Sequence, residues 1–393
     1  MKKIGILTFY HNSCNFGGNL QAYALCALCN QNGYEAEQIA FIESKKTPER
    51  VSVLQKIKKI GIARFPFVLM KRILRNIAHR QPSLKREEKK HNVYARKKAA
   101  FEDFNKNAIP HSKQIYYRDT VYQCVGDYDV FISGSDQIWN TGLYITEYFL
   151  NFVPDEKKKI AYAPSITVNQ LSDEKCEMLS KYLNRYHAVS VRESEAVDLL
   201  QPLCDKPVQF VLDPTFLLDR ADWEKIAEKT VDFGDYIFCY FLGNNEKERK
   251  IAKEYAQSRG LKLATIGHAW KVMKEDKDFG DVRLYDTTPG QFIELIKNAE
   301  YVFTDSFHAV VFSKIFEKQY FVFNRDNKGS MGSRIRTITS LFETEDRFCF
   351  GERETLGYVE SLTDIDYGKE LPEFEKKKKE SIDFLLGALK EEK

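Results

Sequence analysis

The sequence predicts an α/β protein with two Rossmann-like domains that face each other across a cleft, and three observations support this prediction. Its 393 residues are enough for two ordinary domains, each with a core of its own. Short apolar runs alternate with helix-period segments, which is typical of parallel sheets. A proline coincides with a change of strand run within 213–220. We therefore place the N-terminal domain at residues 1–215 and the C-terminal domain at 216–393.

The N-terminal domain opens on an apolar run at 3–9, which predicts a buried strand followed by a polar turn. The periodicity of 20–31 predicts a helix, and 36–42 predicts a second strand. Beyond an insert the same alternation returns. Strands are expected over residues 128–133, 159–164, 188–192 and 210–212, and helices over 172–183 and 193–200.

The C-terminal domain shows the same alternation, beginning with an apolar run that ends at a glycine. Strands are expected over residues 235–243, 262–266, 300–305 and 320–324, and helices over 247–258, from Thr288 and from Ser306. A helix rich in Lys and Glu over 373–389 is expected to cap the body. These elements complete a second parallel sheet.

A strongly basic insert, expected to be helical, interrupts the N-terminal domain at about residues 45–110. The whole chain has a net charge of +3, but residues 45–98 contain 18 Lys and Arg against 3 Asp and Glu. A basic amphipathic segment can lie on an anionic membrane or hold an acidic substrate, and it can also be a solvated helix pair that covers the core. Nucleic acid is not expected as a partner, since no nucleic-acid motif accompanies the charge.

Cysteine usage and the lack of long apolar runs favour a cytoplasmic protein. The eight cysteines do not form a short-spaced ladder, which fits a reducing compartment. Cys26 and Cys29 form a CxxC pair, but the helical pattern around them predicts core positions. No run reaches the ~18 apolar residues of a membrane span, and the first apolar run is too short for a signal peptide. A peripheral position at the inner membrane face follows if the insert binds lipid.

Ligands of open parallel sheets bind beyond the carboxyl ends of the strands, and this rule selects four loops. In the first loop, Asn15, Gly17 and Gly18 precede the helix expected over 20–31. The glycines would let the backbone approach a phosphate closely, although a tight turn between strand and helix requires the same residues. The interpretation stays open between phosphate binding and a structural turn.

The second loop places polar side chains around an aromatic ring, directly after the strand expected over 128–133. Its members are Ser135, Asp136, Gln137, Trp139 and Asn140. Asp and Gln side chains hydrogen-bond sugar hydroxyls, and a Trp ring stacks on a sugar ring. Since a purely structural turn rarely needs so many polar groups, we expect this loop to bind a sugar.

The third and fourth loops carry groups suited to an anion. Arg192 presents a fork that matches a carboxylate or phosphate, with a salt bridge to Glu193 as the alternative. Ser306 is expected to cap a helix whose first N–H groups form an anion site. His308, in the first turn of this helix and near Asp305, is a candidate catalytic residue.

Two further arginines, Arg325 and Arg334, follow the strand expected over 320–324. They flank a segment that contains glycines, which would allow them to close over a phosphate. A solvated basic loop is the alternative interpretation.

At these residues the chain resembles the polysaccharide pyruvyl transferase family. The resemblance runs over six blocks in the family's order: IGILTFYHNSCNFGGNLQAYAL, DVFISGSDQIWN, KIAYAPS, VSVRESEAVDLL, VLDPTFLL and NAEYVFTDSFHAVVFSKIF. The basic stretch 45–98 is not covered. Gly18 stands where the family more usually has Ala or Asp, and Ala309 stands where Gly is common, so these departures bear on substrate choice.

The resemblance implies the GT-B arrangement of two Rossmann domains and the transfer of pyruvate from phosphoenolpyruvate to two hydroxyls of one hexose, as a ketal. It implies that His308 is the general acid or the catalyst on the phosphate side, and that the base is Asp136 or Asp305. The residues expected to hold the donor are Ser306, Arg192, Arg325, Arg334, Asn15, Gly17 and Gly18. The residues expected to face the acceptor are Ser135, Gln137, Trp139 and Asn140. No cofactor and no metal are expected.

Two alternative hypotheses for the function stay open. One is a GT-B glycosyltransferase that uses a nucleotide sugar, and the other is a non-catalytic glycan-binding protein of polysaccharide assembly. In the pyruvyl transferase hypothesis, the acceptor is a sugar of a bacterial cell-surface polysaccharide or its precursor, with a lipid-linked oligosaccharide as one candidate.

Overall fold

Two six-stranded sheets form the body of the protein. The computed structural model describes residues 1–46, 84–140, 145–166, 170–267, 274–325 and 332–390. The first sheet contains β2 (Glu35–Gln38), β1 (Lys3–Leu7), β5 (Val130–Ser133), β6 (Lys158–Ala161), β7 (Ala188–Val191) and β8 (Val208–Phe210), in that order. The second contains β11 (Val282–Leu284), β10 (Lys262–Ile266), β9 (Tyr236–Tyr240), β12 (Tyr301–Thr304), β13 (Gln319–Phe323) and β14 (Phe348–Cys349). Neighbouring strands pair in parallel in both sheets, which confirms the predicted pair of Rossmann-like halves.

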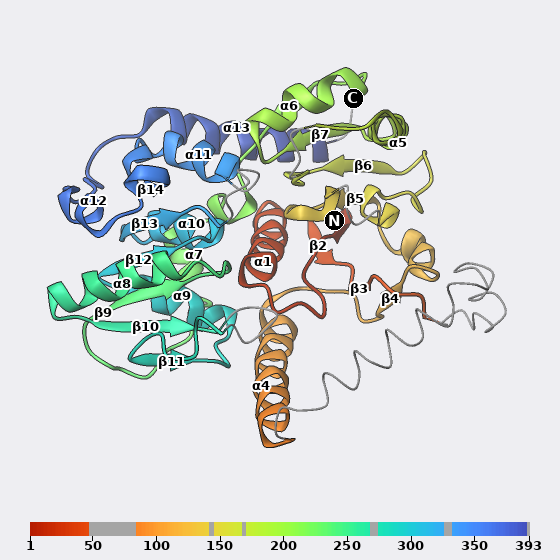
Figure 1. Ribbon diagram of the computed structural model, residues 1–393. Helices are drawn as coiled ribbons and strands as arrows, with labels where there is room; N and C mark the ends of the chain where they lie inside the picture. Colours follow the sequence, from red (N-terminus) through yellow and green to blue (C-terminus); the bar gives the residue numbers. More distant parts are fainter. Residues whose placement is uncertain (47–83, 141–144, 167–169, 268–273, 326–331, 391–393) are drawn as a thin grey trace, which may run out of the picture.

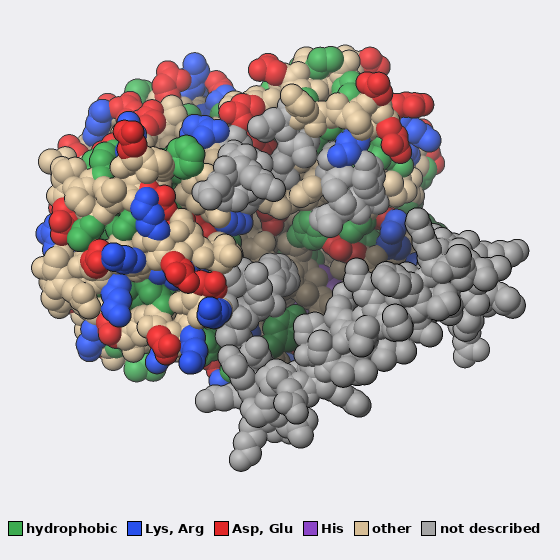
Figure 2. Space-filling view, in the orientation of Figure 1, with side chains coloured by type: hydrophobic (Ala, Val, Ile, Leu, Met, Phe, Trp, Pro, Cys, Tyr) green, Lys and Arg blue, Asp and Glu red, His purple; other side chains and the backbone are tan. Residues whose placement is uncertain are grey.

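The helices connect successive parallel strands or join the two halves (Figure 1). They are α1 (Phe16–Gln31), α4 (Leu84–Ala108), α5 (Asp173–Leu183), α6 (Ser194–Leu200), α7 (Arg220–Glu224), α8 (Glu246–Arg259), α9 (Pro289–Lys297), α10 (Phe307–Ile315), α11 (Gly332–Leu341), α12 (Leu356–Ser361) and α13 (Pro372–Leu389). A small sheet pairs β3 (Phe41–Ile42) with β4 (Tyr116–Tyr117). Figure 2 shows that the two halves border a hollow on one face of the molecule.

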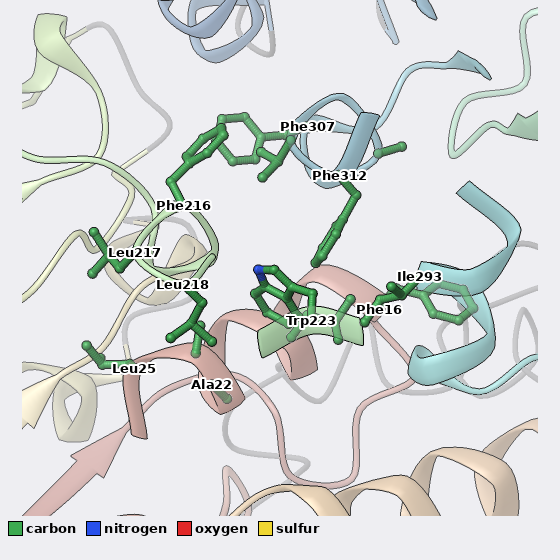
Figure 3. Close-up of a cluster of buried hydrophobic side chains, with 14 of the residues drawn as sticks. Phe16, Ala22, Leu25, Phe216, Leu217, Leu218, Trp223, Ile293, Phe307 and Phe312 are labelled. Atoms are coloured by element: carbon green, nitrogen blue, oxygen red, sulfur yellow. The ribbon is translucent and has the colours of Figure 1, made fainter. Parts of the chain in front are cut away.

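An apolar core joins the two halves around α1. The ring of Phe16 stacks on Phe292 of α9, with their centroids 4.8 Å apart. Trp223 is fully buried and meets Phe312 of α10 edge-on at 4.8 Å. Figure 3 shows Trp223 between Ala22 of α1 and Phe312. Because this core is continuous between the sheets, each half holds the other in place, and truncating a ring of this size costs about 3–5 kcal/mol.

The first helix begins earlier than the sequence predicts. It starts at Phe16 instead of residue 20, so Gly17 and Gly18 lie in its first turn and not in a loop. Because glycine has a low helix propensity, the sequence predicted a turn at the two glycines, but tertiary packing overrides this propensity here. A side chain at either position would meet neighbouring groups, since a Cβ on Gly17 would lie 1.8 Å from Nδ1 of His308.

The last helix crosses back to the first sheet. In α13 the hydroxyl of Ser381 accepts from the backbone N–H of Leu212 at 2.9 Å, and the carbonyl of Ala388 accepts from Lys158 Nζ of β6 at 3.0 Å. Although α13 follows the second sheet in the sequence, it therefore packs on the N-terminal half (Figure 1). The short strands β11 and β14 were not predicted, because two or three residues are too few to show a periodicity.

The basic insert is described only in part. Residues 47–83 lie outside the described residues, so the predicted contact of 45–98 with an anionic membrane stays a prediction. In the described part, Lys97 of α4 is only 4% exposed. Its Nζ donates to the carbonyl of Gly267 at 2.7 Å and lies 5.0 Å from the centre of the Phe16 ring. At least one charge of the insert thus faces the interior and ties α4 to the end of β10. Within the part of the chain described, no helix is both long enough and apolar enough to cross a bilayer.

Candidate active site

A pocket of about 690 Å³ lies where the carboxyl ends of strands from both sheets meet. Its first-sheet wall is made of Phe9, His11, Asn12, Ser13, Asn15, Phe41, Ile42, Glu43, Ser44, Asp136, Gln137 and Tyr148. Its second-sheet wall is made of Leu242, Ser306, Phe307, His308, Arg325 and Arg334. Hydrophobic, acidic and histidine side chains gather in the corresponding hollow in Figure 2. The position agrees with the rule that open parallel sheets bind ligands beyond the carboxyl ends of their strands.

His308 reaches the pocket from the first turn of α10 and faces a buried carboxylate. Its Nε2 lies 3.6 Å from Oδ2 of Asp213, which follows β8 and is 1% exposed. The same Oδ2 accepts from Arg192 at 2.6 Å and from the Ser135 hydroxyl at 3.1 Å, while Oδ1 accepts from Thr215. Burial alone would raise the pKa of Asp213, but His308, Arg192 and Thr215 outweigh it and hold the pKa well below its usual value. Asp213 is therefore ionised behind His308 at neutral pH.

Arg192 lies behind the pocket wall and not in it. It is 3% exposed and forms its closest ion pair with Asp213. Its Nη2 is 3.6 Å from Oδ1 of Asp136, and its guanidinium lies 4.7 Å from the centre of the Phe307 ring. The Arg192 charge is thus largely balanced by carboxylates, and the side chain supports the pocket residues Asp136 and Phe307.

Arg325 and Arg334 carry positive charge into the pocket. Arg325 donates from Nη2 to the backbone carbonyl of Asp305 at 3.1 Å. Burial first, and then repulsion by Arg192 and Arg325, lowers the pKa of Arg334 to about 10. When the Gln137 amide oxygen faces Arg334, it lies 3.2 and 3.1 Å from the two terminal nitrogens. A guanidinium disfavoured by its cationic neighbours would be stabilised by a bound anion.

The N-terminal end of α10 adds to this positive region. The backbone N–H of Ser306 donates to the Thr304 hydroxyl at 3.0 Å, and the Ser306 side chain makes no capping bond to the helix. The first turn of a helix carries partial positive charge, which favours an anion. Ser306, His308, Arg325 and Arg334 therefore surround one end of the pocket with positive or potentially positive groups.

The structure separates the two candidates for the general base. Asp136 lines the pocket and accepts from Asn15 Nδ2 at 3.3 Å. Its φ of +69° is unusual for a residue with a side chain, and such strain is often found at functional sites. Asp305 is not among the residues that line the pocket. Its carboxylate accepts hydrogen bonds from the backbone N–H groups of Leu242 and Gly243 at 2.7 and 2.6 Å. Asp305 thus fixes the turn after β9.

Of the residues expected to face an acceptor, the structure places Gln137 alone on the described pocket wall. Trp139 has no exposed surface, stacks on Phe149 with centroids 5.2 Å apart, and donates from Nε1 to the Tyr148 carbonyl. The expectation that it stacks on a sugar is wrong, because the short turn after Asp136 directs the ring into the core. The Ser135 hydroxyl is also buried and bonds Ala163 and Asp213. Asn140 is half-buried and outside the pocket wall.

Of the three candidate residues in the first loop, one lines the pocket and two are packing positions. Asn15 lines the pocket beside Asp136. Gly17 lies under the His308 ring, and a Cβ on Gly18 would lie 2.7 Å from the carbonyl of Phe9. In this structure the glycines allow α1 to approach other protein groups, so the structure supports the packing interpretation of this loop.

Sequence reasoning missed Asp213 and most of the aromatic part of the pocket. Asp213 follows β8, so the rule that selected the other loops could have selected it too. Phe9, Phe41 and Tyr148 line the pocket from a strand end, a two-residue strand and a 3₁₀ turn, and no periodic pattern marks them as ligand contacts. Among the described residues, no group of three or more His, Cys, Asp or Glu side chains is placed to hold a metal ion.

Comparison with solved structures identifies the fold. The UDP-GlcNAc 2-epimerase from Methanocaldococcus jannaschii is similar with a TM-score of 0.52 and 10% identity, over 98% of this chain and 99% of that chain. S. aureus MnaA with UDP gives a TM-score of 0.47 and 9% identity, over 100% and 99%. An α-glucosyltransferase with UDP gives 0.46 and 8%, over 98% and 95%. The likeness to the epimerase shows the GT-B-like pair of Rossmann-like domains. No curated protein sequence matches significantly.

Comparison with protein families identifies the relationship in sequence. The family model described as polysaccharide pyruvyl transferase matches residues 15–327. This range covers most of the chain and contains Asn15, Asp136, Arg192, Asp213 and His308. The chain therefore belongs to the polysaccharide pyruvyl transferase family, which is a family of enzymes.

Proposed function

We propose that the protein transfers pyruvate from phosphoenolpyruvate to two hydroxyls of one sugar in a bacterial cell-surface polysaccharide or its precursor. The observation that carries this proposal is the charge of the two pocket walls. One wall presents His308, Arg325, Arg334 and the N-terminal end of α10, and the other presents Asp136. An anionic donor and a hydroxyl-bearing acceptor match these two walls. The proposal requires no cofactor and no metal.

The donor needs groups for two anionic ends. Phosphoenolpyruvate carries a phosphate and a carboxylate, and a guanidinium matches either group in shape and charge. We place these ends against Arg325, Arg334 and the first turn of α10. Arg192 acts from behind, where it balances Asp213 and holds Asp136.

The reaction balances with one acid and one base. Protonation of the methylene carbon of phosphoenolpyruvate makes the neighbouring carbon electrophilic, and a first sugar hydroxyl adds to that carbon. A second hydroxyl then displaces phosphate with cleavage of the carbon–oxygen bond, and its proton leaves on the phosphate. One ketal and one inorganic phosphate form, and no electrons are gained or lost. We assign the proton donor to His308 and the acceptor of the first hydroxyl's proton to Asp136, and solvent returns both side chains to their starting protonation states.

Asp213 makes His308 suitable for this role. A buried carboxylate lies 3.6 Å from Nε2 and fixes the ring orientation. Gly17 holds the opposite edge of the ring, because the space there does not admit a Cβ. The orientation of the ring is therefore fixed from both sides.

Thermal-shift measurements test the donor assignment. We expect phosphoenolpyruvate to stabilise the wild-type protein and to stabilise the His308→Ala variant less. UDP, GDP and CMP serve as the comparison panel. Stabilisation by a nucleotide and none by phosphoenolpyruvate would contradict the proposal and favour a glycosyltransferase that uses a nucleotide sugar.

A further inference from the structure

An aromatic cluster forms the part of the pocket that lies away from the arginines. Phe9 and Tyr148 have ring centroids 4.8 Å apart, and Phe41 meets Tyr148 edge-on at 5.6 Å. All three residues line the pocket, and Phe9 is only half-buried. Because Phe41 and Tyr148 are only 3% and 2% exposed, Phe9 is the ring of the cluster that presents free apolar surface to the pocket.

A carboxylate lies beside this cluster. The Tyr148 hydroxyl donates to Oε1 of Glu43 at 3.0 Å, and Glu43 also lines the pocket. Its Oε2 has no hydrogen bond to Tyr148, and its side chain is exposed enough to meet a ligand. An ionised carboxylate is an acceptor only, so it suits hydroxyl groups and repels other anions.

The charged side chains of the first-sheet wall and the second-sheet wall are opposite in sign. Among the described lining residues, the arginines come from the second-sheet wall, whereas Asp136 and Glu43 are on the first-sheet wall. A ligand on the first-sheet wall that carried its own carboxylate or phosphate would lie near both carboxylates. In a partly desolvated pocket such like-charge contact is costly.

We propose that Phe9, Phe41, Tyr148 and Glu43 form the acceptor subsite and that this subsite selects an uncharged pyranose. The apolar C–H face of the sugar ring packs on Phe9, whose ring Tyr148 and Phe41 support from behind, and Glu43 accepts hydrogen bonds from hydroxyls at the sugar's edge. The assignment of this sugar as an acceptor rests on the proposed pyruvyl transfer. The volume of about 690 Å³ leaves room for such a sugar beside a small anionic donor, within the size range of ligand pockets.

A pair of sugars that differ at one carbon provides the test. Methyl β-D-glucopyranoside is neutral, and methyl β-D-glucopyranosiduronate carries a carboxylate at the same carbon. Binding of each sugar to the full-length chain is measured by saturation-transfer NMR without donor, and competition between the two sugars gives their relative affinity. We expect the neutral sugar to bind about tenfold more tightly, and we expect saturation transfer to its ring protons.

Two variants separate the contributions of ring and charge. Phe9→Ala is expected to weaken binding of both sugars about tenfold, and Glu43→Gln to reduce the preference for the neutral sugar to about twofold. Phe350→Ala and Glu35→Gln, which alter exposed residues outside the pocket wall, serve as matched controls and should change neither quantity. Circular dichroism and thermal melting verify that each variant is folded.

A separate measurement of donor binding distinguishes a failure of the proposed sugar subsite from a failure of the proposed pyruvyl transfer. Phosphoenolpyruvate binding is measured by calorimetry on the same variants and should stay within about twofold of wild type. If phosphoenolpyruvate does not bind to the wild type but Phe9→Ala still weakens sugar binding, the donor assignment fails and the subsite stands. Equal or tighter binding of the charged sugar, no binding of either sugar to the wild type, or unchanged binding in both variants would overturn the subsite.

Discussion

His308 Nε2 and Asp213 Oδ2 lie 3.6 Å apart although their residues come from different sheets. His308 is in the first turn of α10 in the C-terminal half, and Asp213 follows the last strand of the N-terminal sheet. The pair can form only when the two halves are packed as they are here. The apolar core around α1 and Trp223 therefore does more than stabilise the fold, since it also sets the distance between a candidate acid and its counter-ion.

Replacing Asp213 with Asn should impair both catalysis and stability. His308 would lose the carboxylate beside its Nε2, and we expect the rate of transfer to fall about 10²-fold or more. Arg192 would lose its closest carboxylate, and breaking one partner of a buried pair costs about 3 kcal/mol or more. Steady-state kinetics and urea unfolding measure the two effects. Wild-type activity in a folded Asp213→Asn variant would contradict the role given to this pair.

The stability loss of Asp213→Asn should depend on pH in a defined direction. Because the folded protein holds the pKa of Asp213 below its usual value, the carboxylate stabilises the fold above about pH 4, and that contribution is lost as the pH falls further. The difference in unfolding free energy between wild type and variant should be largest near neutral pH and shrink below about pH 4. A difference that grows on acidification would contradict the sign of this linkage.

Replacing Gly17 with Ala should displace the His308 ring. The new Cβ would lie 1.8 Å from Nδ1, so the ring or α1 must move. We expect a loss of transfer activity of about 10²-fold, larger than the loss of stability would explain. Gly387→Ala in α13 is the matched control, since a Cβ there meets nothing within 4 Å and should stabilise the helix by roughly 0.5–1 kcal/mol. Equal activity in the two glycine variants would show that Gly17 does not position His308.

Lys97 should give the protein a measurable pH dependence on the alkaline side. Burial lowers the pKa of Lys97 to about 8, so between about pH 8 and 10.4 the unfolded chain binds the proton that the folded chain has released. Unfolding free energy should therefore rise with pH through this window in the wild type relative to Lys97→Met, by roughly 3 kcal/mol in total. Parallel pH profiles of the two proteins would contradict the burial of this amine.

Replacing Trp139 with Leu should affect folding and leave the pocket residues in place. The ring is fully buried, and its loss is expected to cost about 2–4 kcal/mol through lost packing and the lost bond to the Tyr148 carbonyl. The acceptor KM should change far less than in Phe9→Ala. A selective rise in acceptor KM without loss of stability would restore the sequence-based assignment of Trp139 to sugar binding.

The sequence predicted the sheets better than the side chains at their edges. Strands buried on both faces appear as continuous apolar runs, so β5, β9 and β12 were recognisable. The same rule of strand ends placed Asp136 and His308 correctly at the pocket. It could not show that the Trp139 side chain points into the core or that Arg192 lies behind the pocket wall. The rule places a loop at the sheet edge, but the backbone conformation of each loop residue decides the direction of its side chain. The contact between Gly17 and His308 joins distant segments and leaves no local pattern.

The most direct test of the central claim is product analysis with phosphoenolpyruvate and a panel of neutral hexopyranosides. We predict that the wild-type protein releases inorganic phosphate and yields a sugar whose mass increases by one pyruvate less one water, and that His308→Gln yields neither. Release of phosphate without a modified sugar would show that the panel lacks the acceptor while the donor chemistry stands. Neither phosphate nor ketal from any sugar, or equal yields from wild type and His308→Gln, would contradict pyruvyl transfer at this pocket.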